Sequence, residues 1–353
     1  MSTHYTLSLK KKSIELSPPE LPNTGKQEWL ALTKWLSGNL QEILNRVDAV
    51  PPDLEEIRLR IGQPLLLKAS EQDIFLDSCG QRTSQAKAYR IRQSDITETL
   101  ERMTNSSIYA VNEKLKQGFL ILPGGHRVGV AGQVIMQGDE LQTIKNISAV
   151  NFRLAKAIKG RAIEVLPFLL EAGSLKHTLI ISAPRAGKTT FLRDLICLLS
   201  KGVPKLGLKG LTVGVVDERG ELAGMWQGIP SFDLGPRTDV LDSCSKAKGI
   251  GMLVRAMAPD VIAVDELGHS EDVLAVADAL RTGVKILGTA HAESLEEACK
   301  RPTLKELLQQ QFIERIVVLS RKRGPGTVEG VFRPDNGCIF KTSDLRPELL
   351  NNS

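Results

Sequence analysis

Aromatic residues are scarce in this chain, and long apolar runs are absent. Phe, Trp and Tyr make up 4% of the 353 residues. Such a low content argues against a surface that stacks single-stranded bases, because those surfaces need aromatic platforms. No run approaches the roughly 20 apolar residues of a membrane-spanning helix. Lys10, Lys11 and Lys12 interrupt the apolar residues near the N-terminus, so we expect no secretion signal.

Paired cysteines and a strong charge imbalance are also lacking. The 5 cysteines show no C-x-x-C spacing, so we expect reduced thiols in a cytoplasmic protein and no zinc site. The net charge is +5 and the pI is about 8.9. This mild excess fits an anionic partner such as a nucleotide or an acidic membrane surface. It is too small to indicate nucleic acid by itself.

The length and the patterning predict two domains between two tails. We expect a flexible tail over residues 1–26, an N-terminal α+β domain over 27–154, an α/β domain over 155–342 and a C-terminal tail over 343–353. In the N-terminal domain the apolar spacing predicts one or two amphipathic helices over 27–47 and a further helix over 91–103. Alternation and turn residues predict strands at 56–60, 64–67, 118–123, 127–135 and 147–154.

Strands and helices alternate in the second domain, which indicates a parallel sheet with helices on both faces. A helix over 163–170, kinked at Pro167, comes first. The apolar runs then predict strands at 178–182, 211–217, 260–265, 284–289 and 314–319, and a final hairpin over 327–339.

One loop of this domain has the pattern of a phosphate-binding loop between a strand and a helix. It is close to G-x-x-x-x-G-K-[ST], with Ser182 where the first Gly is usual, so we expect a less free backbone there. Backbone N–H groups would wrap the phosphates of ATP, Lys188 would reach the β- and γ-phosphates, and Thr189 would hold Mg²⁺. The predicted nucleotide-binding residues are Ser182, Ala183, Pro184, Arg185, Ala186, Gly187, Lys188, Thr189 and Thr190.

Polar residues end three further strands of the predicted sheet. Asp265 and Glu266 follow an apolar strand in the manner of a Walker B element, with Asp265 as a Mg²⁺ ligand and Glu266 as the residue that polarises water. Glu218, after the strand that ends at Asp217, competes for that second role. His291 ends another strand and is placed to sense the γ-phosphate. Ligands bind beyond the carboxyl ends of such strands, so we expect one shared crevice.

Hydrolysis also needs positive charge near the γ-phosphate, and an arginine from a neighbouring subunit can supply it. Spacing alone does not choose among the candidates, which are Arg58, Arg60, Arg127, Arg185, Arg237, Arg255 and Arg281.

With these motifs the chain resembles the secretion/traffic ATPase superfamily, in which an N-terminal domain precedes a RecA-like P-loop core. The acidic stretch 217–221 looks like its acidic box and residues 289–292 look like its histidine box. Within the superfamily the chain is similar to the stage III sporulation protein AA family. The stretches that carry this similarity are residues 56–62, 124–129, 216–219, 235–242 and 255–262.

The resemblance implies a cytoplasmic, Mg²⁺-dependent ATPase that assembles as a homo-oligomer, a hexamer, and binds ATP. It would lie peripherally at the membrane, on the mother-cell side of the forespore envelope. Its partners would be membrane proteins of a sporulation channel complex, which it would power or gate. Two alternatives remain open. One is a nucleotide-binding scaffold with little turnover, suggested by Ser182. The other is a nucleic-acid-dependent ATPase, against which the few aromatics and the weak basic excess count.

Overall fold

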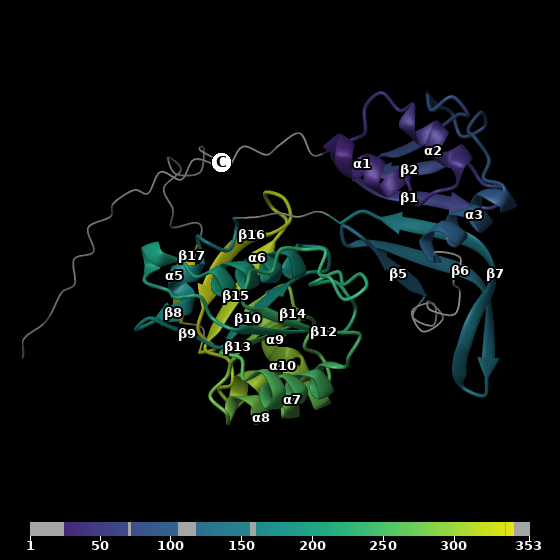
Figure 1. Cartoon of the computed structure of the whole chain (residues 1–353). Helices are drawn as coiled ribbons and strands as arrows, with labels where there is room; N and C mark the ends of the chain where they lie inside the picture. Colours follow the sequence, from purple (N-terminus) through teal and green to yellow (C-terminus); the bar gives the residue numbers. More distant parts are fainter. Residues whose placement is uncertain (1–24, 70–71, 105–117, 156–159, 336, 342–353) are drawn as a thin grey trace, which may run out of the picture.

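The chain folds into two parts, each built on its own β-sheet (Figure 1). The structure is a computed structural model that describes residues 25–69, 72–104, 118–155, 160–335 and 337–341. We call the described residues before 156 the N-terminal part and those after 159 the core. The tail predicted for 343–353 and nearly all of the tail predicted for 1–26 lie outside the described residues.

The N-terminal part is a seven-stranded antiparallel sheet with the order β4-β3-β2-β1-β7-β6-β5. Its strands are β1 (Leu54–Arg60), β2 (Leu66–Ala69), β3 (Asp73–Leu76), β4 (Arg82–Thr83), β5 (Phe119–Leu122), β6 (His126–Gln137) and β7 (Glu140–Arg153). The helices α1 (Gly25–Thr33), α2 (Gly38–Asn45) and α3 (Gln93–Thr104) share one apolar cluster with the inward residues of these strands. The predicted break near Gly38 therefore separates two helices.

The core is an eight-stranded sheet with the order β12-β11-β13-β14-β10-β15-β16-β17. The strands β10 (Thr178–Ser182), β11 (Val213–Asp217), β12 (Thr238–Asp242), β13 (Val261–Val264), β14 (Lys285–His291) and β15 (Arg315–Ser320) run parallel. The hairpin strands β16 (Thr327–Phe332) and β17 (Cys338–Lys341) add antiparallel pairs at one edge. One strand, β14, separates β10, which precedes the predicted phosphate loop, from β13, which Asp265 follows. The predicted α/β class, with an N-terminal α+β part, is confirmed.

Two apolar clusters bury both faces of the core sheet, as parallel strands require. On β10, Ile180 points into one cluster, while Leu179 and Ile181 point into the other. The first face is covered by α6 (Lys188–Lys201). The second is covered by α7 (Lys246–Met257), α8 (Ser270–Leu280) and α10 (Pro302–Gln309), next to the short α9 (Leu295–Lys300). This packing fixes the position at which each strand ends and therefore the geometry of the loops that follow.

Three local predictions were wrong or incomplete. The helix expected over 163–170 is only α5 (Leu166–Leu169), with Pro167 in its first turn, and the short strands β8 (Leu170–Glu171) and β9 (Ser174–Leu175) follow. Proline lacks an N–H and is tolerated in the first turn of a helix, so it begins this helix and does not kink it. The strands β3, β4 and β12 were not predicted. Every residue of β12 is half-buried, so its sequence lacks a continuous apolar run.

A histidine lies at the end of the core sheet opposite the strand ends discussed below. His177 Nδ1 accepts a hydrogen bond from the Ile286 N–H, at 3.2 Å, and Nε2 lies 3.3 Å from Lys285 Nζ. Burial, together with the charge of Lys285, lowers the pKa of His177 to about 4. The folded protein therefore keeps this imidazole neutral at pH values at which the unfolded chain protonates it.

We expect this histidine to make folding stability fall with acidification. Because the folded pKa is below the unfolded one, the stabilisation is present at pH 7 and is lost between about pH 6.5 and 4. From pH 7 to pH 5 the loss is about 2 kcal/mol. Denaturant unfolding of wild type and His177→Gln at both pH values measures it, and the variant should lose about 2 kcal/mol less over this interval. Equal losses in the two proteins would contradict the assignment.

Candidate functional site

Four parallel strands of the core bring their carboxyl ends to one edge of the sheet. Ser182 at the end of β10 is in register with His291 at the end of β14. On the other side of β14, Val264 of β13 pairs with Gly288, and Val216 of β11 pairs with Val264. The residues that follow β13 and β11 therefore emerge beside the phosphate loop, as the sequence predicted.

Ser182 takes an extended strand position, so the expected loss of backbone freedom there does not arise. The left-handed conformations of the loop fall at Arg185, with φ 61°, and at Gly187, with φ 90°. The Ser182 hydroxyl donates to the Ala183 carbonyl at 2.7 Å. A serine in place of the usual glycine thus imposes no strain at this position, whereas Arg185 adopts a conformation that a side chain disfavours.

Gly187 has no room for a side chain, which gives a test of the loop. A Cβ atom there would lie 2.8 Å from Gly326 N, whose N–H donates to the Ala186 carbonyl. Gly283 is also left-handed, with φ 85°, but a Cβ there meets open space. We expect Gly187→Ala to lower the unfolding free energy by about 3 kcal/mol and Gly283→Ala by about 1 kcal/mol. Urea denaturation measures both, and equal losses would show that the 324–326 turn does not press on the loop.

Lys188 begins α6 and turns its ammonium back over the loop. Nζ lies 3.4 Å from the carbonyl oxygens of Ser182 and Ala183 and 3.1 Å from His291 Nδ1. Burial lowers the pKa of Lys188, while the carboxylates of Asp265 and Glu266 act in the opposite direction. An ammonium is only a donor, so His291 Nδ1 is the acceptor and the ring proton lies on Nε2.

The next residue joins the loop to the predicted Walker B strand. Thr189 Oγ1 donates to Asp265 Oδ2 at 2.7 Å, and the other oxygen of Asp265 accepts from the Thr289 hydroxyl. A hydroxyl and a carboxylate side by side are the oxygen donors that Mg²⁺ takes alongside water and phosphate, so the residues present fit this ion. Among the described residues, no group of three or more His, Cys, Asp or Glu side chains could hold a metal ion without such additional ligands.

Glu266 is held between two basic side chains in a strained backbone conformation. Its φ is 54°, and its N–H donates to the Thr289 hydroxyl at 2.9 Å. His291 Nε2 donates to Oε1 at 3.1 Å, and Arg219 pairs with Oε2. Burial would raise the pKa of Glu266, but the His291 hydrogen bond and the Arg219 charge bring it below the usual value. Strain of this kind in a non-glycine residue clusters at functional sites.

The competing carboxylate, Glu218, lines a small hollow beside Asp265 and Glu266 and is held there by another cation. It pairs with Lys246, at the start of α7, whose side chain is only 6% exposed. Glu218 does not line the cleft that contains Lys188, Glu266 and His291. The geometry therefore favours Glu266 for a role beside the phosphates.

Asp217 shapes the segment that leaves the sheet after β11. It accepts hydrogen bonds from the N–H groups of Glu221, Leu222 and Ala223 at 2.7–3.2 Å. Burial raises the pKa of Asp217, whereas these backbone donors act to lower it. Arg193 of α6 donates to the Glu221 and Leu222 carbonyls, at 2.6 and 2.9 Å. These bonds fasten the turn after β11 to the helix of the phosphate loop.

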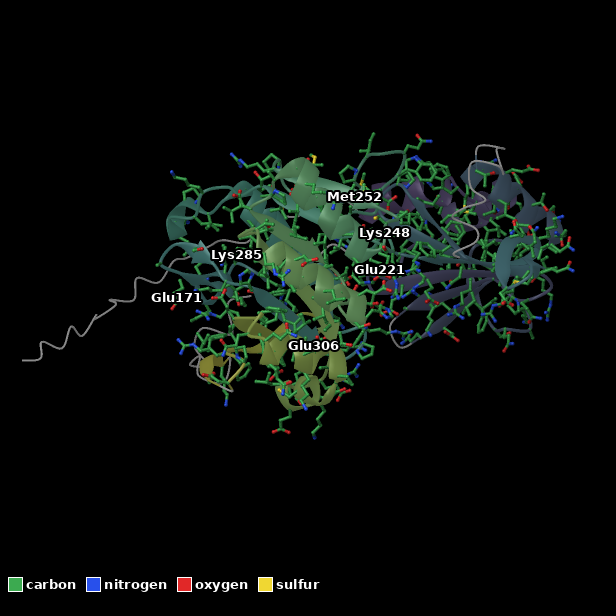
Figure 2. All side chains as sticks on the ribbon, turned by 90° about the horizontal axis from the view of Figure 1, so that it is seen from below. Glu171, Glu221, Lys248, Met252, Lys285 and Glu306 are labelled. Atoms are coloured by element: carbon green, nitrogen blue, oxygen red, sulfur yellow. The ribbon has the colours of Figure 1, made fainter. Side chains whose placement is uncertain are left out.

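That turn also contacts the N-terminal part. Glu221 pairs with Arg127 of β6 at 2.5 Å and lies where the core meets the N-terminal part (Figure 2). Further along, Trp226 packs edge-on against Trp35, with ring centroids 5.6 Å apart. A movement of the phosphate-loop helix can therefore be passed on to the N-terminal part through β6 and through Trp35.

The cleft above the strand ends has walls from both parts and a volume of about 480 Å³. Its core wall includes Pro184, Arg185, Gly187, Lys188, Thr189, Glu221, Glu266 and His291. Its N-terminal wall includes Glu55, Glu56, Arg58, Lys68, Arg153 and Leu154. Of the arginines named from the sequence, Arg58 and Arg185 line this cleft. Arg127 lies on Glu221, Arg237 is bonded to Ser200, and Arg281 pairs with Asp278 on an exposed face.

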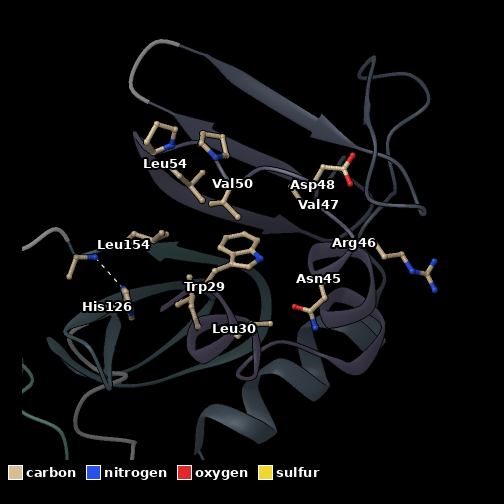
Figure 3. A pocket seen from close by; sticks show the side chains of 14 residues that line it. Trp29, Leu30, Asn45, Arg46, Val47, Asp48, Val50, Leu54, His126 and Leu154 are labelled. Carbon is tan, nitrogen blue, oxygen red and sulfur yellow. Dashed lines mark hydrogen bonds between the residues drawn. The ribbon is translucent and has the colours of Figure 1, made fainter. Parts of the chain in front are cut away.

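A larger cavity, of about 810 Å³, lies within the N-terminal part and contains none of the predicted site residues (Figure 3). Trp29, Val50 and Leu54 form part of its apolar lining. His126 lies at its edge, where Nδ1 accepts a hydrogen bond from the Ala155 N–H at 3.2 Å.

Sequence reasoning missed four residues that the structure adds to the site. Arg219 and Lys246 neutralise the two competing glutamates, and Arg153 and Lys68 form part of the N-terminal wall. Arg219 stands next to Glu218 directly after a strand end, and this position could have singled it out. Nothing in the spacing of the other three residues points to the crevice.

The comparison with known families now decides the relationship of the chain. The family model described as "Sporulation stage III, protein AA" matches residues 26–338. The chain belongs to this family. The stage III sporulation protein AA of Bacillus subtilis (strain 168) is 39% identical over 294 residues, which are 83% of this chain and 91% of the relative. An uncharacterized ycf45 protein of Porphyra purpurea is 30% identical to this chain over 164 residues, which are 46% of this chain and 27% of the ycf45 protein.

Solved structures of secretion and pilus ATPases have a related shape. The pilus retraction motor PilT with bound ADP gives a TM-score of 0.48 at 15% identity, covering 75% of this chain and 74% of PilT. The Legionella pneumophila ATPase DotB gives a TM-score of 0.47 at 14% identity, covering 75% and 72%. At these values we draw no functional conclusion from either protein. No helix among the described residues of this sporulation-family chain has the length and apolarity to cross a bilayer.

Proposed function

We propose that this sporulation-family protein is an ATPase that hydrolyses Mg²⁺-ATP in the cleft between the core and the N-terminal part. The observation that carries the proposal is the meeting of three elements at one edge of the sheet. These are the buried Lys188, the Thr189–Asp265 oxygen pair, and Glu266 beside His291. Each was expected from a separate stretch of sequence, and together they form the donor and acceptor set of phosphoryl transfer.

The residues divide the work as follows. The N–H groups of residues 185–190 and the Lys188 ammonium bind the phosphates, and Thr189 with Asp265 would hold the ion. The ion, when bound, neutralises charge that develops on the β- and γ-oxygens. Glu266 orients the attacking water and accepts its proton, while His291 keeps the carboxylate turned toward the cleft through its 3.1 Å hydrogen bond. Arg58 and Arg153 supply positive charge from the opposite wall.

The contacts between the two parts support a mechanical use of the hydrolysis. We infer two domains, over 27–154 and 155–342, whose relative position responds to the cleft. The Arg127–Glu221 pair and the Trp35–Trp226 contact lie on the route between them. Membership of the family leads us to propose that the protein acts on membrane proteins of a sporulation channel complex. It would do so as a homo-oligomer, a hexamer, at the cytoplasmic side of the mother-cell membrane that faces the forespore.

The observation that suggested a scaffold with little turnover no longer supports that alternative. That alternative came from Ser182, and Ser182 lies in an extended position without backbone strain. The contact between Glu266 and His291 within one chain supports turnover.

Phosphate release measured over a range of protein concentrations, with mass determined in parallel, tests the proposal. We expect release that depends on Mg²⁺ and rises as the protein assembles. Assembly with ATP bound and no release would favour the scaffold. Release that requires single-stranded nucleic acid would favour the nucleic-acid-dependent ATPase. No binding of ATP at any concentration would overturn the proposal.

A further inference from the structure

Both oxygens of Glu266 are occupied in this structure. Oε1 accepts from His291, and Oε2 pairs with Arg219. Each oxygen keeps a second acceptor site, but a carboxylate that takes a proton from water must also be basic, and a guanidinium on Oε2 opposes this. His291 serves to aim the side chain, so the partner whose departure makes Glu266 a stronger base is Arg219.

The Arg219 pair is one that can exchange at little cost. The Arg219 side chain is 56% exposed, and that of Glu266 is 32% exposed. Ion pairs at this level of exposure contribute little to stability, because water screens them and two long side chains must be ordered. A guanidinium, moreover, binds a phosphate with two parallel hydrogen bonds. A γ-phosphate in the cleft therefore competes well for this arginine.

Arg219 lies next to the cleft through its partner. It lines a small hollow together with Glu218, Asp265 and Glu266, and Glu266 also lines the cleft that contains Lys188 and Thr189, so a change of Arg219 rotamer would be needed to reach a phosphate there. The neighbouring acids have other cations: Glu218 pairs with Lys246, and Glu221 pairs with Arg127. Two cations among the described residues line this hollow, Arg219 and Lys246, and of these two Arg219 is the one bonded to Glu266.

Lys188 and Arg219 stand at the two ends of one chain of contacts, which runs Lys188–His291–Glu266–Arg219. Phosphates attract both ends. When the β- and γ-phosphates take Lys188, His291 loses its donor at Nδ1, and when the γ-phosphate takes Arg219, Glu266 loses its second cation. A diphosphate reaches only the first end.

From these contacts we propose that Arg219 exchanges Glu266 for the γ-phosphate, so that Glu266 loses its guanidinium partner and activates water only when a triphosphate is bound. This inference rests on the proposed function. It makes Arg219 a positioning residue in the empty site and a phosphate ligand in the loaded one. The chain thereby discriminates a nucleoside triphosphate from a diphosphate with a residue of its own subunit.

Equilibrium binding of ADP and of the non-hydrolysable imido analogue of ATP, with Mg²⁺ present, tests the exchange. For Arg219→Gln we expect about 10- to 100-fold weaker binding of the analogue and less than about 3-fold weaker binding of ADP. Arg219→Lys keeps the charge but cannot make two parallel hydrogen bonds to one phosphate, so its affinity for the analogue should fall between those of wild type and Arg219→Gln. Arg301→Gln removes an arginine of similar exposure, 49%, that pairs with Glu297 away from the cleft, and should match wild type.

Turnover separates this role from a structural one. In Arg219→Gln we expect KM for ATP to rise. We expect kcat to fall by a smaller factor, because Glu266 no longer pairs with an arginine. Equal loss of ADP and analogue binding, or no loss of either, would overturn the exchange. A wild-type protein that discriminates the two nucleotides through Arg219 yet releases no phosphate would refute the proposed hydrolysis and leave the exchange standing.

Discussion

Glu266→Gln should bind ATP with nearly unchanged affinity and hydrolyse it about 10²- to 10³-fold more slowly than wild type. Glutamine keeps the shape and can still accept from His291 Nε2, which lies 3.1 Å from Oε1 of Glu266. It cannot take a proton from the attacking water. Single-turnover phosphate release and equilibrium nucleotide binding, measured on the same preparation, separate the two effects.

Glu218→Gln is the matched control, because Glu218 was an equal candidate for orienting water on sequence grounds. It pairs with Lys246 outside the cleft, so we expect its turnover to stay within about 5-fold of wild type. Thermal unfolding of both variants checks that the fold is retained. If Glu218→Gln abolished turnover while Glu266→Gln kept it, the two assignments would have to be exchanged.

Lys188→Ala should remove both nucleotide binding and turnover, the latter by about 10³-fold. The Lys188 side chain is the buried cation of the loop, 6% exposed, and no other ammonium of the described residues contacts the loop carbonyls. Its loss leaves the phosphates without their direct counter-charge.

Lys201→Ala provides the control on the same helix. Lys201 ends α6, is 49% exposed and pairs with Asp233. Its removal changes the net charge by the same amount, and we expect ATP binding and turnover to remain at the wild-type level. A similar loss in both variants would mean that the effect of Lys188→Ala comes from net charge or from helix stability.

The strands of the core and the loops after them could be predicted from the sequence because two local signals agree there. Buried parallel strands such as Val261–Val264 are continuous apolar runs, and each ends in a polar residue with a chemical use. In a parallel sheet the carboxyl ends share one edge, so Lys188, Asp265 and His291 had to meet. The parallel topology of the sheet therefore places the separate motifs around one crevice.

The rest of the site could not be predicted, because it depends on contacts between residues far apart in sequence. Glu218 and Glu266 follow similar strands, and only the three-dimensional partners, Lys246 for one and His291 for the other, distinguish them. Arg153 belongs to the N-terminal sheet and has no local feature that places it opposite the phosphate loop. For Ser182 the sequence suggested a restricted loop, whereas the backbone needs left-handed conformations three and five positions later, at Arg185 and Gly187.

The most direct test of the central claim is single-turnover release of phosphate from ATP, with Mg²⁺ and with a chelator, by wild type and Lys188→Ala. The site described here predicts release by wild type that the chelator stops and that Lys188→Ala lacks. Release that persists in Lys188→Ala, or a wild-type protein that binds ATP and releases no phosphate in any assembly state, would contradict it.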